Sequence, residues 1–447
     1  MQLRKRDGMR ILLLMMALVA AACGGDDSGS DRTTTTTAAA TTTTAGDSGA
    51  TTTIAAPVET TPIDVPGFST WEEVLAAADG TTVNWFQWGG DDTHNQNVDR
   101  DIGDRIKELY NIDLNRVPVT DTADAVNKVL DEKAAGVDTG GTVDLIWING
   151  ENFRTLKSAD LLYGPWAEEL PNSTFVPWDI PGVANDFGEP VAGLESPWGH
   201  AQFVMEYNTD FISDPPTTFE DLQTWVHDNP GLFTYPAIPD FTGSVFVRHV
   251  FIWANGGDTT PFVGPFDQAK FDEVAPIVWE YLNDIEDDLW RGGDTYPEAN
   301  TMLDLLANQE IYFNMGYGPS RASTNIASGV YPESIRTFIF DTGTLSNNNY
   351  VAIPFNAENP AAAMVLANYI LTPEFQLVMS DPEGPWGWLI PTDPSGWPAE
   401  DQATLASFGT GIATLPAAEL NANALQEPGG DWVTAMEAGW IENVPEK

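Results

Sequence analysis

The amino-acid sequence predicts an α/β protein whose folded part is built from two lobes. Strand and helix patterns alternate three times from Thr82 to Leu161, and a stretch rich in proline, glycine and tryptophan follows at 164–200. A second alternating region then runs to about residue 340. Successive strand–helix pairs favour a parallel sheet covered by helices. With 447 residues, of which 42% are hydrophobic, the chain is long enough for more than one such unit.

The first lobe is expected over residues 67–200. Strands are predicted at 82–86 and 143–148, and the alternation of residues 112–119 predicts another. Asn149 is placed to cap the helix that follows the third strand. The residues that recur at helical spacing after the three strands are Val98, Ile102, Ile106 and Leu109, then Ala125, Val126, Val129 and Leu130, then Phe153, Leu156 and Leu161.

The second lobe is expected over residues 201–340, and residues 341–447 are expected to return to the first lobe and end in helices. Residues 201–208 alternate between two sets of side chains and predict a strand. The sequence T-F-E-D from Thr218 has the form of a capping box and predicts a helix start. Further strands are predicted at 232–235, 311–313, 337–340 and 350–353, and further helices at 245–254, 360–371 and 373–380.

The N-terminus predicts export and membrane attachment. Basic residues, a short apolar run and three alanines have the order of a signal peptide over residues 1–22, and the run is too short for a spanning helix. The only cysteine, Cys23, follows at once, which resembles a bacterial lipoprotein signal and predicts lipidation there. The alternative is an ordinary secretory signal. Residues 23–66 are rich in threonine and poor in large apolar residues, which predicts a disordered tether.

The charge excludes one class of function and weakly favours another. The chain has 19 basic and 66 acidic side chains, which argues against a protein that binds nucleic acid by neutralising phosphates. An acidic surface favours a cationic ligand, although adaptation to salty medium gives the same composition. The four histidines show no metal-ligand spacing, and neither a G-x-S-x-G elbow nor a phosphate-binding loop is present. We therefore predict no metal, no cofactor and no catalytic residues.

Five stretches of the chain resemble one family. They are WFQWGG, GGTVDLIWINGENFRTLKSADLL, ESPWGHAQFV, YPAIPDFTGSVFV and NNNYVAIPFNAENPAAAMVLANYILTPEFQ. They resemble the YnjB-like substrate-binding proteins of ABC importers, a family assigned to thiamine-type transport. The resemblance covers residues 80–390 and does not extend to 395–447. It implies the two-lobed periplasmic-binding fold of type II, a ligand site between hinged lobes, chain crossings near 200 and 340, and no catalysis.

Ligands of open α/β sheets bind beyond the carboxyl ends of the strands, which points first to the end of the strand at 82–86. Trp88 is a candidate for stacking on a ring or holding a cation. Gly89 and Gly90 would let a ligand approach the backbone closely. The alternatives are a core tryptophan and a turn that needs positive φ.

Two further acidic candidates lie in the first lobe. Glu151 and Asn152 stand at a strand-to-helix junction, where they could bind a cation or cap the helix. Glu195 and Trp198 lie just before the first predicted crossing and suit a cationic aromatic ligand. The alternative for Trp198 is a structural tryptophan in a proline turn.

The remaining candidates lie in or beside the second lobe. Asp240 and Thr242 open the helix at 245–254, where the N-terminus could hold a phosphate or simply be capped. Tyr317 could close over a ring from the opposite wall, and Asn349 at the return crossing could reach the ligand.

The sequence therefore predicts a monomeric, lipid-anchored solute receptor outside the cytoplasm that delivers a small solute to an ABC permease. Thiamine or a thiamine phosphate is the expected ligand. A polyamine, a sugar and ferric iron stay open as alternatives, the last because of Tyr312, Tyr317 and Tyr350. An extracellular carbohydrate-active enzyme that uses paired carboxylates is the alternative from another class.

Overall fold

The computed structural model describes residues 60–382 and 384–444. The predicted signal peptide, Cys23 and most of the predicted tether lie outside these residues. The tether was predicted to run to residue 66, but β1 (Pro62–Val65) already pairs antiparallel with β2 (Phe68–Thr70) around Gly67, whose φ is +88°. The alternating Ile63 and Val65 pack against the first hydrophobic core, so the folded part begins earlier than composition indicated.

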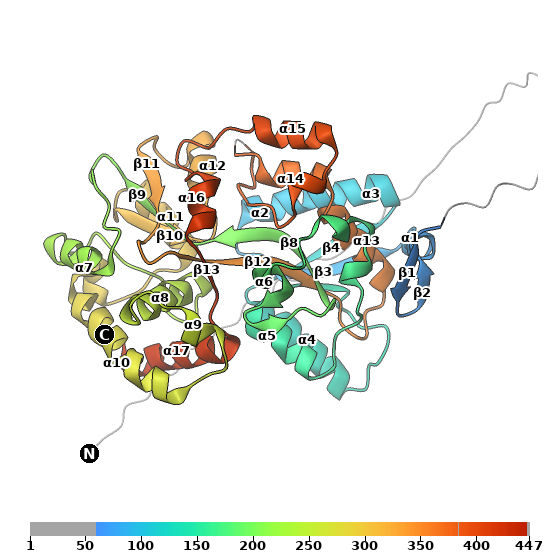
Figure 1. The fold of residues 1–447 in the computed structure, drawn as a ribbon, viewed down its shortest axis with the longest axis horizontal. Coiled ribbons are helices and arrows are strands. Elements are labelled where there is room, and N and C mark those ends of the chain that lie inside the picture. The colour runs from blue at the N-terminus through green and yellow to red at the C-terminus, as the bar shows by residue number, and fades with distance from the viewer. Residues whose placement is uncertain (1–59, 383, 445–447) are drawn as a thin grey trace, which may run out of the picture. The chain divides into compact units, whose positions relative to one another are not determined.

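A six-stranded mixed sheet forms the first lobe (Figure 1). Its order is β13-β12-β5-β3-β4, with β8 also paired to β12. β3 is parallel to β4 and β5, as the strand–helix alternation predicted, whereas β12 is antiparallel to β5 and β8. The strands are β3 (Thr82–Trp88), β4 (Asp113–Val119), β5 (Leu145–Ile148), β8 (Glu195–Gln202), β12 (Thr344–Ala352) and β13 (Ala424–Gln426).

Hydrophobic residues cover both faces of this sheet, because neighbouring residues of a strand point to opposite faces. Leu145 and Val351 belong to the core on one face, and Ile146 and Ala352 to the core on the other. The helices of this lobe are α1 (Trp71–Ala78), α2 (Asp92–Asn97), η1 (Val98–Gly103), α3 (Asp104–Tyr110), α4 (Thr122–Ala134), α5 (Gly150–Ser158), α6 (Pro181–Ala184), α13 (Pro360–Ile370), α14 (Pro373–Ser380) and α15 (Ala399–Ser407).

The second lobe has a three-stranded antiparallel sheet, order β10-β9-β11, and more helices than strands. Its strands are β9 (Val204–Asn208), β10 (Phe313–Gly316) and β11 (Ile335–Phe338). Its larger helices are α7 (Phe219–Asp228), α8 (Phe241–Ala254), α10 (Gln268–Ile285), α11 (Ala299–Ala307), α12 (Arg321–Ala327), α16 (Ala417–Ala422) and α17 (Gly430–Asn443). α8 is apolar around most of its circumference and is buried from Gly243 to Ile252, which makes it the central helix of this core.

Of two predicted features of the second lobe, one is confirmed and the other is wrong. Thr218 caps α7 by accepting a hydrogen bond from the N–H of Asp221 at 3.1 Å, as predicted. The predicted strand at 232–235 is wrong: this apolar segment is buried but joins neither sheet. Instead, the carbonyl of Leu232 accepts a hydrogen bond from the Tyr312 N–H, and the carbonyl of Phe233 accepts one from the Trp290 N–H. Periodicity cannot separate such a buried segment from a strand.

The chain crosses between the lobes in neighbouring antiparallel strands. β8 runs into β9 through Phe203, which belongs to the second core, and β12 returns with Leu345 in the second core and Val351 in the first. Within the described residues no single helix is long and apolar enough to span a membrane, and α13 with α14 reaches that length only as a pair bent by 61°.

Candidate functional site

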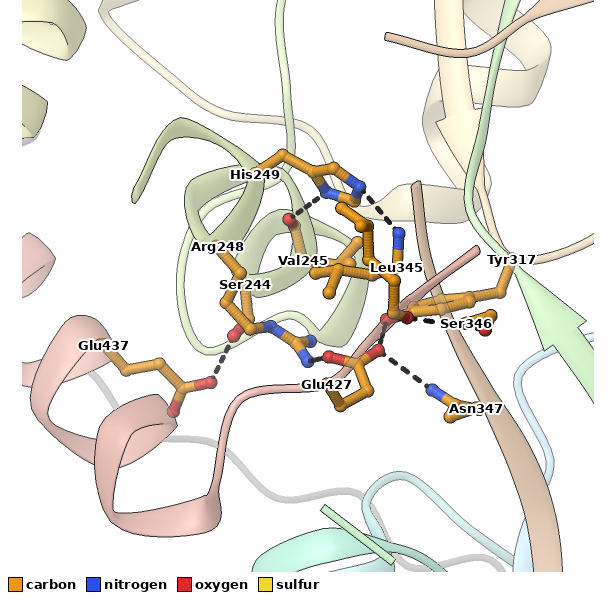
Figure 2. A network of polar contacts seen from close by, with 11 residues as sticks. Ser244, Val245, Arg248, His249, Tyr317, Leu345, Ser346, Asn347, Glu427 and Glu437 are labelled. Atoms are coloured by element: carbon orange, nitrogen blue, oxygen red, sulfur yellow. Dashed lines mark hydrogen bonds and ion pairs between the residues drawn. The ribbon is translucent and has the colours of Figure 1, made fainter. Parts of the chain in front are cut away.

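A network of buried polar side chains lies beside the return crossing (Figure 2). Glu427, which follows β13, is its centre and is 2% exposed. One carboxylate oxygen accepts from Arg248 Nη1 at 2.5 Å, and the other accepts from the Tyr317 hydroxyl and from Asn347 Nδ2 at 3.1 Å. Arg248 lies in the middle of α8 and is 1% exposed, so the ion pair is buried. Glu427 thus joins a helix and a loop of the second lobe to the crossing strand β12.

His249 attaches α8 to the same crossing strand. Its Nδ1 hydrogen-bonds the carbonyl of Val245 at 2.8 Å, and its Nε2 accepts from the backbone N–H of Leu345 at 3.0 Å. Burial lowers the pKa of His249 to about 3, so the ring is neutral and Nδ1 carries the proton. The position of α8 relative to β12 is therefore fixed by an uncharged histidine beside the buried ion pair.

Aromatic faces stand next to this ion pair. Phe241, the first residue of α8, is 49% exposed, and its ring centroid lies 5.3 Å from that of Tyr317. The Arg248 guanidinium lies 5.2 Å from the Phe241 ring and 5.6 Å from the Phe187 ring. Aromatic faces at these distances attract cations. A large apolar ring left half in solvent beside a buried charge is the kind of surface that a ligand can cover.

Carboxylates outnumber cations at this place. Glu151 from α5 and Glu437 from α17 act electrostatically on Arg248 in addition to Glu427. Glu437 accepts from the Ser244 hydroxyl at 2.6 Å. Three carboxylates against one guanidinium leave the cluster with an excess of two negative charges when all are ionised. We call Glu151, Arg248, Glu427 and Glu437, with Phe241 and Tyr317, the inter-lobe cluster.

The pKa values follow from this crowding. The pKa of Glu151 is raised, first because the surrounding protein removes water from its carboxylate and then because Glu437 adds negative charge, although its own backbone N–H offsets part of this. The pKa of Tyr317 is raised well above its usual value by burial and by the Glu427 carboxylate. Tyr317 therefore stays protonated and donates its hydroxyl to Glu427.

The start of α5, which carries Glu151, is capped by a residue from a later part of the chain. Asn149, predicted to cap this helix, makes no side-chain cap bond; its Nδ2 donates to the carbonyl of Asn348 at 2.6 Å instead. Asp186 takes the capping role, because its Oδ2 accepts from the Gly150 N–H at 2.5 Å. Burial raises the pKa of Asp186 well above its usual value, with Glu151 adding to the shift. The Nδ2 of Asn152 donates to the Oε1 of Glu151 at 3.4 Å.

Gly89 and Gly90, which follow β3, allow neighbouring side chains to pack closely against the backbone. A Cβ at Gly90 would lie 2.5 Å from the Trp88 ring, and a Cβ at Gly89 would lie 2.3 Å from Pro118. The half-buried Trp88 therefore folds over its own turn. The carbonyl of Gly90 also accepts from Asn300 Nδ2 of α11 at 2.6 Å, which is a contact between the two lobes. These neighbours account for both glycines by packing, and the approach of a ligand there stays a prediction.

Trp198 is part of a buried aromatic cluster in the first lobe. It is fully buried, with ring centroids of Trp85 at 5.3 Å, Trp147 at 5.2 Å and Trp388 at 4.9 Å. His94 stacks on Trp388 at 5.5 Å, and burial lowers its pKa to about 4. The structural alternative for Trp198 is thus the one that the structure favours.

Glu195 is also fully buried, and neither carboxylate oxygen has a hydrogen-bond partner among the described residues. Burial raises its pKa well above the usual value, with Asp186 adding to the shift. The charged side chains that act on Glu195 are Asp186, Lys157 and Glu189, so the structure does not bring it together with Arg248.

The helix start at 240–242 and the return crossing complete the predicted set. Asp240 caps α8, accepting from the N–H groups of Thr242 at 2.8 Å and Gly243 at 3.3 Å. Those donors are therefore not free for a phosphate, which corrects that interpretation. Asn349 accepts from Trp147 Nε1 at 3.2 Å. Of the predicted residues, Glu151 and Tyr317 share Arg248 as an electrostatic partner.

Sequence reasoning missed Arg248, Phe241, Glu427 and Glu437. Arg248 had a usable signal, because an arginine within the apolar run V-F-V-R-H-V-F of α8 must be paired if it is buried. Glu427 and Glu437 are separated from it by more of the chain than any local pattern can cover.

A family comparison decides the class of protein. The sequence model of the family described as bacterial extracellular solute-binding protein matches residues 101–393. The chain belongs to this family. It is also 40% identical over 375 residues to Protein YnjB of Escherichia coli (strain K12), covering 83% of this chain and 93% of that one. The resemblance predicted from the five sequence stretches is thereby confirmed.

Solved structures share the fold. The spermidine/putrescine ABC transporter substrate-binding protein PotD from Streptococcus pneumoniae matches with a TM-score of 0.58 and 13% identity over 81% of this chain and 98% of that one. AfuA from Actinobacillus pleuropneumoniae, with fructose-6-phosphate bound, matches at 0.56 and 11% over 81% and 98%. A Trichodesmium protein in complex with iron and citrate matches at 0.52 and 12% over 82% and 100%.

These matches establish the two-lobed type II periplasmic-binding fold. The chain is a solute-binding component of an ABC transporter, with a small-molecule ligand, a membrane permease as partner and a location outside the cytoplasm. Its family and fold relatives are transport components and not enzymes.

Proposed function

We propose that this protein captures a small organic cation that carries an aromatic ring, thiamine or a thiamine phosphate in the first place, and presents it to an ABC permease. The observation that carries the proposal is the charge excess of the inter-lobe cluster beside the half-exposed ring of Phe241. A cation would neutralise part of that excess, and a flat ring would cover Phe241.

In this proposal both lobes contribute to the same ligand. Glu151 comes from the first lobe, and Phe241 and Tyr317 come from the second. A ligand that contacts both walls stabilises the closed arrangement of the lobes, and the permease distinguishes that state from the open one. The bond from Asn300 to the carbonyl of Gly90 is an additional contact between the lobes.

The other ligands that the sequence left open fit less well. A polyamine matches the excess of two negative charges but leaves the ring of Phe241 without a stacking partner. A sugar does not need the charge of the three carboxylates, and the one arginine among them is already paired with Glu427. Ferric iron would need the tyrosines together, but Tyr312 stacks on Phe211 and the hydroxyl of Tyr350 donates to the carbonyl of Val183.

A ligand panel tests the proposal. The full chain is heated in the presence of thiamine, thiamine monophosphate, spermidine, maltose and fructose 6-phosphate, and the unfolding midpoint is recorded for each. A ligand at 100 times its Kd stabilises the folded state by about 2.7 kcal/mol. We expect thiamine or its phosphate to raise the midpoint the most. If only a neutral or anionic sugar raises it, the proposed ligand class is wrong.

Binding by the cluster should depend on pH through Glu151. Because the pKa of Glu151 is raised, its carboxylate takes up a proton at a higher pH than an ordinary glutamate, and the attraction for a cation is lost as the pH falls through that value. Glu151 is exposed as a residue, so solvent screens part of the effect. We expect Glu151→Gln to weaken thiamine binding about tenfold at pH 8, or about 1.4 kcal/mol.

Calorimetric titration of the wild type and Glu151→Gln at pH 8 and pH 6 checks this expectation. The comparison cancels any titration of the ligand itself. The difference in affinity between the two proteins should be smaller at the lower pH. Equal affinities at pH 8 would show that Glu151 does not contact the cation.

We also propose that Cys23 is lipidated and that the Thr-rich segment after it tethers the receptor to the membrane. Two acyl chains together hold a protein stably on a bilayer. Cys23→Ser is expected to move the protein from the membrane fraction to the soluble fraction of cells. Retention of the variant in membranes would contradict the lipid anchor.

A further inference from the structure

The C-terminal segment forms a third connection between the lobes. After the part that the family comparison covers, α15 packs against α14 of the first lobe. The chain then enters the second lobe, where Ala413 is buried and its N–H donates to the Ser323 hydroxyl at 2.9 Å. β13 next pairs in parallel with the return crossing, Thr344 opposite Ala424.

The last helix of this segment contacts both lobes. Trp432 and Trp440 of α17 belong to the core of the second lobe. Asp431 at its start pairs with Arg154 of α5, in the first lobe, at 2.5 Å. α17 thus begins at the helix that carries Glu151 and packs along α8, which carries Arg248. The segment is placed where both walls of the inter-lobe cluster meet.

Two of the three carboxylates of the cluster come from this segment. Arg248 and Glu151 lie within the part of the chain that the family comparison covers, and their two charges cancel when both groups are ionised. Glu427 and Glu437 add two negative charges. The charge excess on which the proposed function rests is therefore contributed by residues after 393.

The two carboxylates have different surroundings. Glu427 is buried and bonded through both oxygens, to Arg248, Tyr317 and Asn347. It is a positioning residue that orients the Tyr317 ring and the Arg248 guanidinium. Glu437 is half-buried, and the contact recorded for it is the bond from Ser244 to one of its two oxygens. Its charge acts on both Arg248 and Glu151.

We infer that the C-terminal segment from Gly411 to Asn443 determines the charge preference of this receptor, with Glu437 as a direct partner of the ligand's cation and Glu427 as the residue that positions Arg248 and Tyr317. The inference rests on the proposed function and names the residues that select the cation. It predicts that ligand charge is encoded in a part of the chain outside the general family match.

The test compares Glu437→Gln with Glu442→Gln in the full chain. Glu442 lies on the same helix, is exposed and has no contact with the cluster, so its replacement controls for the charge of α17. Thiamine and spermidine are titrated calorimetrically at low and at moderate salt. We expect Glu437→Gln to weaken binding of the better cation about tenfold and to reduce the salt dependence of its Kd, with Glu442→Gln close to the wild type.

The outcomes separate the inference from the proposed function. If the wild type binds a cation and Glu437→Gln binds it with unchanged Kd and unchanged salt dependence, the inference is overturned and the proposed function stands. If the wild type binds neither cation, the titration of the wild type alone overturns both. Glu437→Lys provides a second test in the same titration. Because it reverses the charge, it should weaken cation binding more than Glu437→Gln does.

Discussion

Replacing Arg248 by methionine is expected to lower the free energy of unfolding by about 3–5 kcal/mol, which is the usual cost of removing one partner of a buried ion pair. Methionine fills similar volume, so the loss comes mainly from the Glu427 carboxylate, which is 2% exposed and would be left buried without its cationic partner. Bonds from Tyr317 and Asn347 would remain and moderate the cost.

Urea unfolding of the wild type, Arg248→Met and the double variant Arg248→Met/Glu427→Gln measures this effect. The double variant removes the stranded charge and should recover more than half of the loss. Arg105→Met is the matched control, because Arg105 pairs with Glu108 and Glu374 at the surface, where such pairs contribute less than about 1 kcal/mol. A loss of under about 1 kcal/mol in Arg248→Met would contradict the buried pair.

Replacing Trp198 by alanine is expected to cost about 3–5 kcal/mol of stability, as for other large aromatic residues in cores. The side chain is fully buried and lies against Trp85, Trp147 and Trp388, so its removal leaves a cavity and takes away several ring contacts. Trp198→Phe keeps one ring in place and should cost less.

Thermal and urea unfolding give the stability of both variants, and titration of the Phe variant gives its affinity for the ligand. Because the structure places Trp198 in the core, the affinity of folded Trp198→Phe should equal that of the wild type. A stable alanine variant with strongly weakened binding would instead support the ligand-contact role that the sequence first predicted.

The architecture of the first lobe could be predicted because its strands are buried on both faces. The short run Leu145–Ile148 is apolar throughout, and the helices on either side of it show the 3.6 period. The second lobe was harder, since its helices outnumber its strands and the apolar segment at 232–235 is buried without joining a sheet.

The candidate site was predicted only in part, for a physical reason. Glu151 and Tyr317 stand directly after strands, and the carboxyl ends of strands are where ligands bind. Glu427 reaches the same place from a segment far along the chain, and only tertiary structure pairs it with Arg248. Glu195 and Trp198 looked equally suitable in sequence, but the residues that bury them belong to other strands and loops.

The glycines after β3 illustrate the same limit. A double glycine at the end of a strand indicates a close approach of something to the backbone. In this protein the approaching groups are the chain's own Trp88 and Pro118. The sequence carries the steric requirement, but it does not state whether a ligand or a side chain meets it.

A crystal structure of the full chain with the cation that binds most tightly in the ligand panel tests the central claim most directly. The account predicts the positive group within about 6 Å of the Phe241 ring, the usual range of a cation–π contact, and within salt-bridge distance of Glu151 or Glu437. A ligand bound elsewhere, for example among Trp147, Trp388 and His94 without contact to any of these carboxylates, would contradict it.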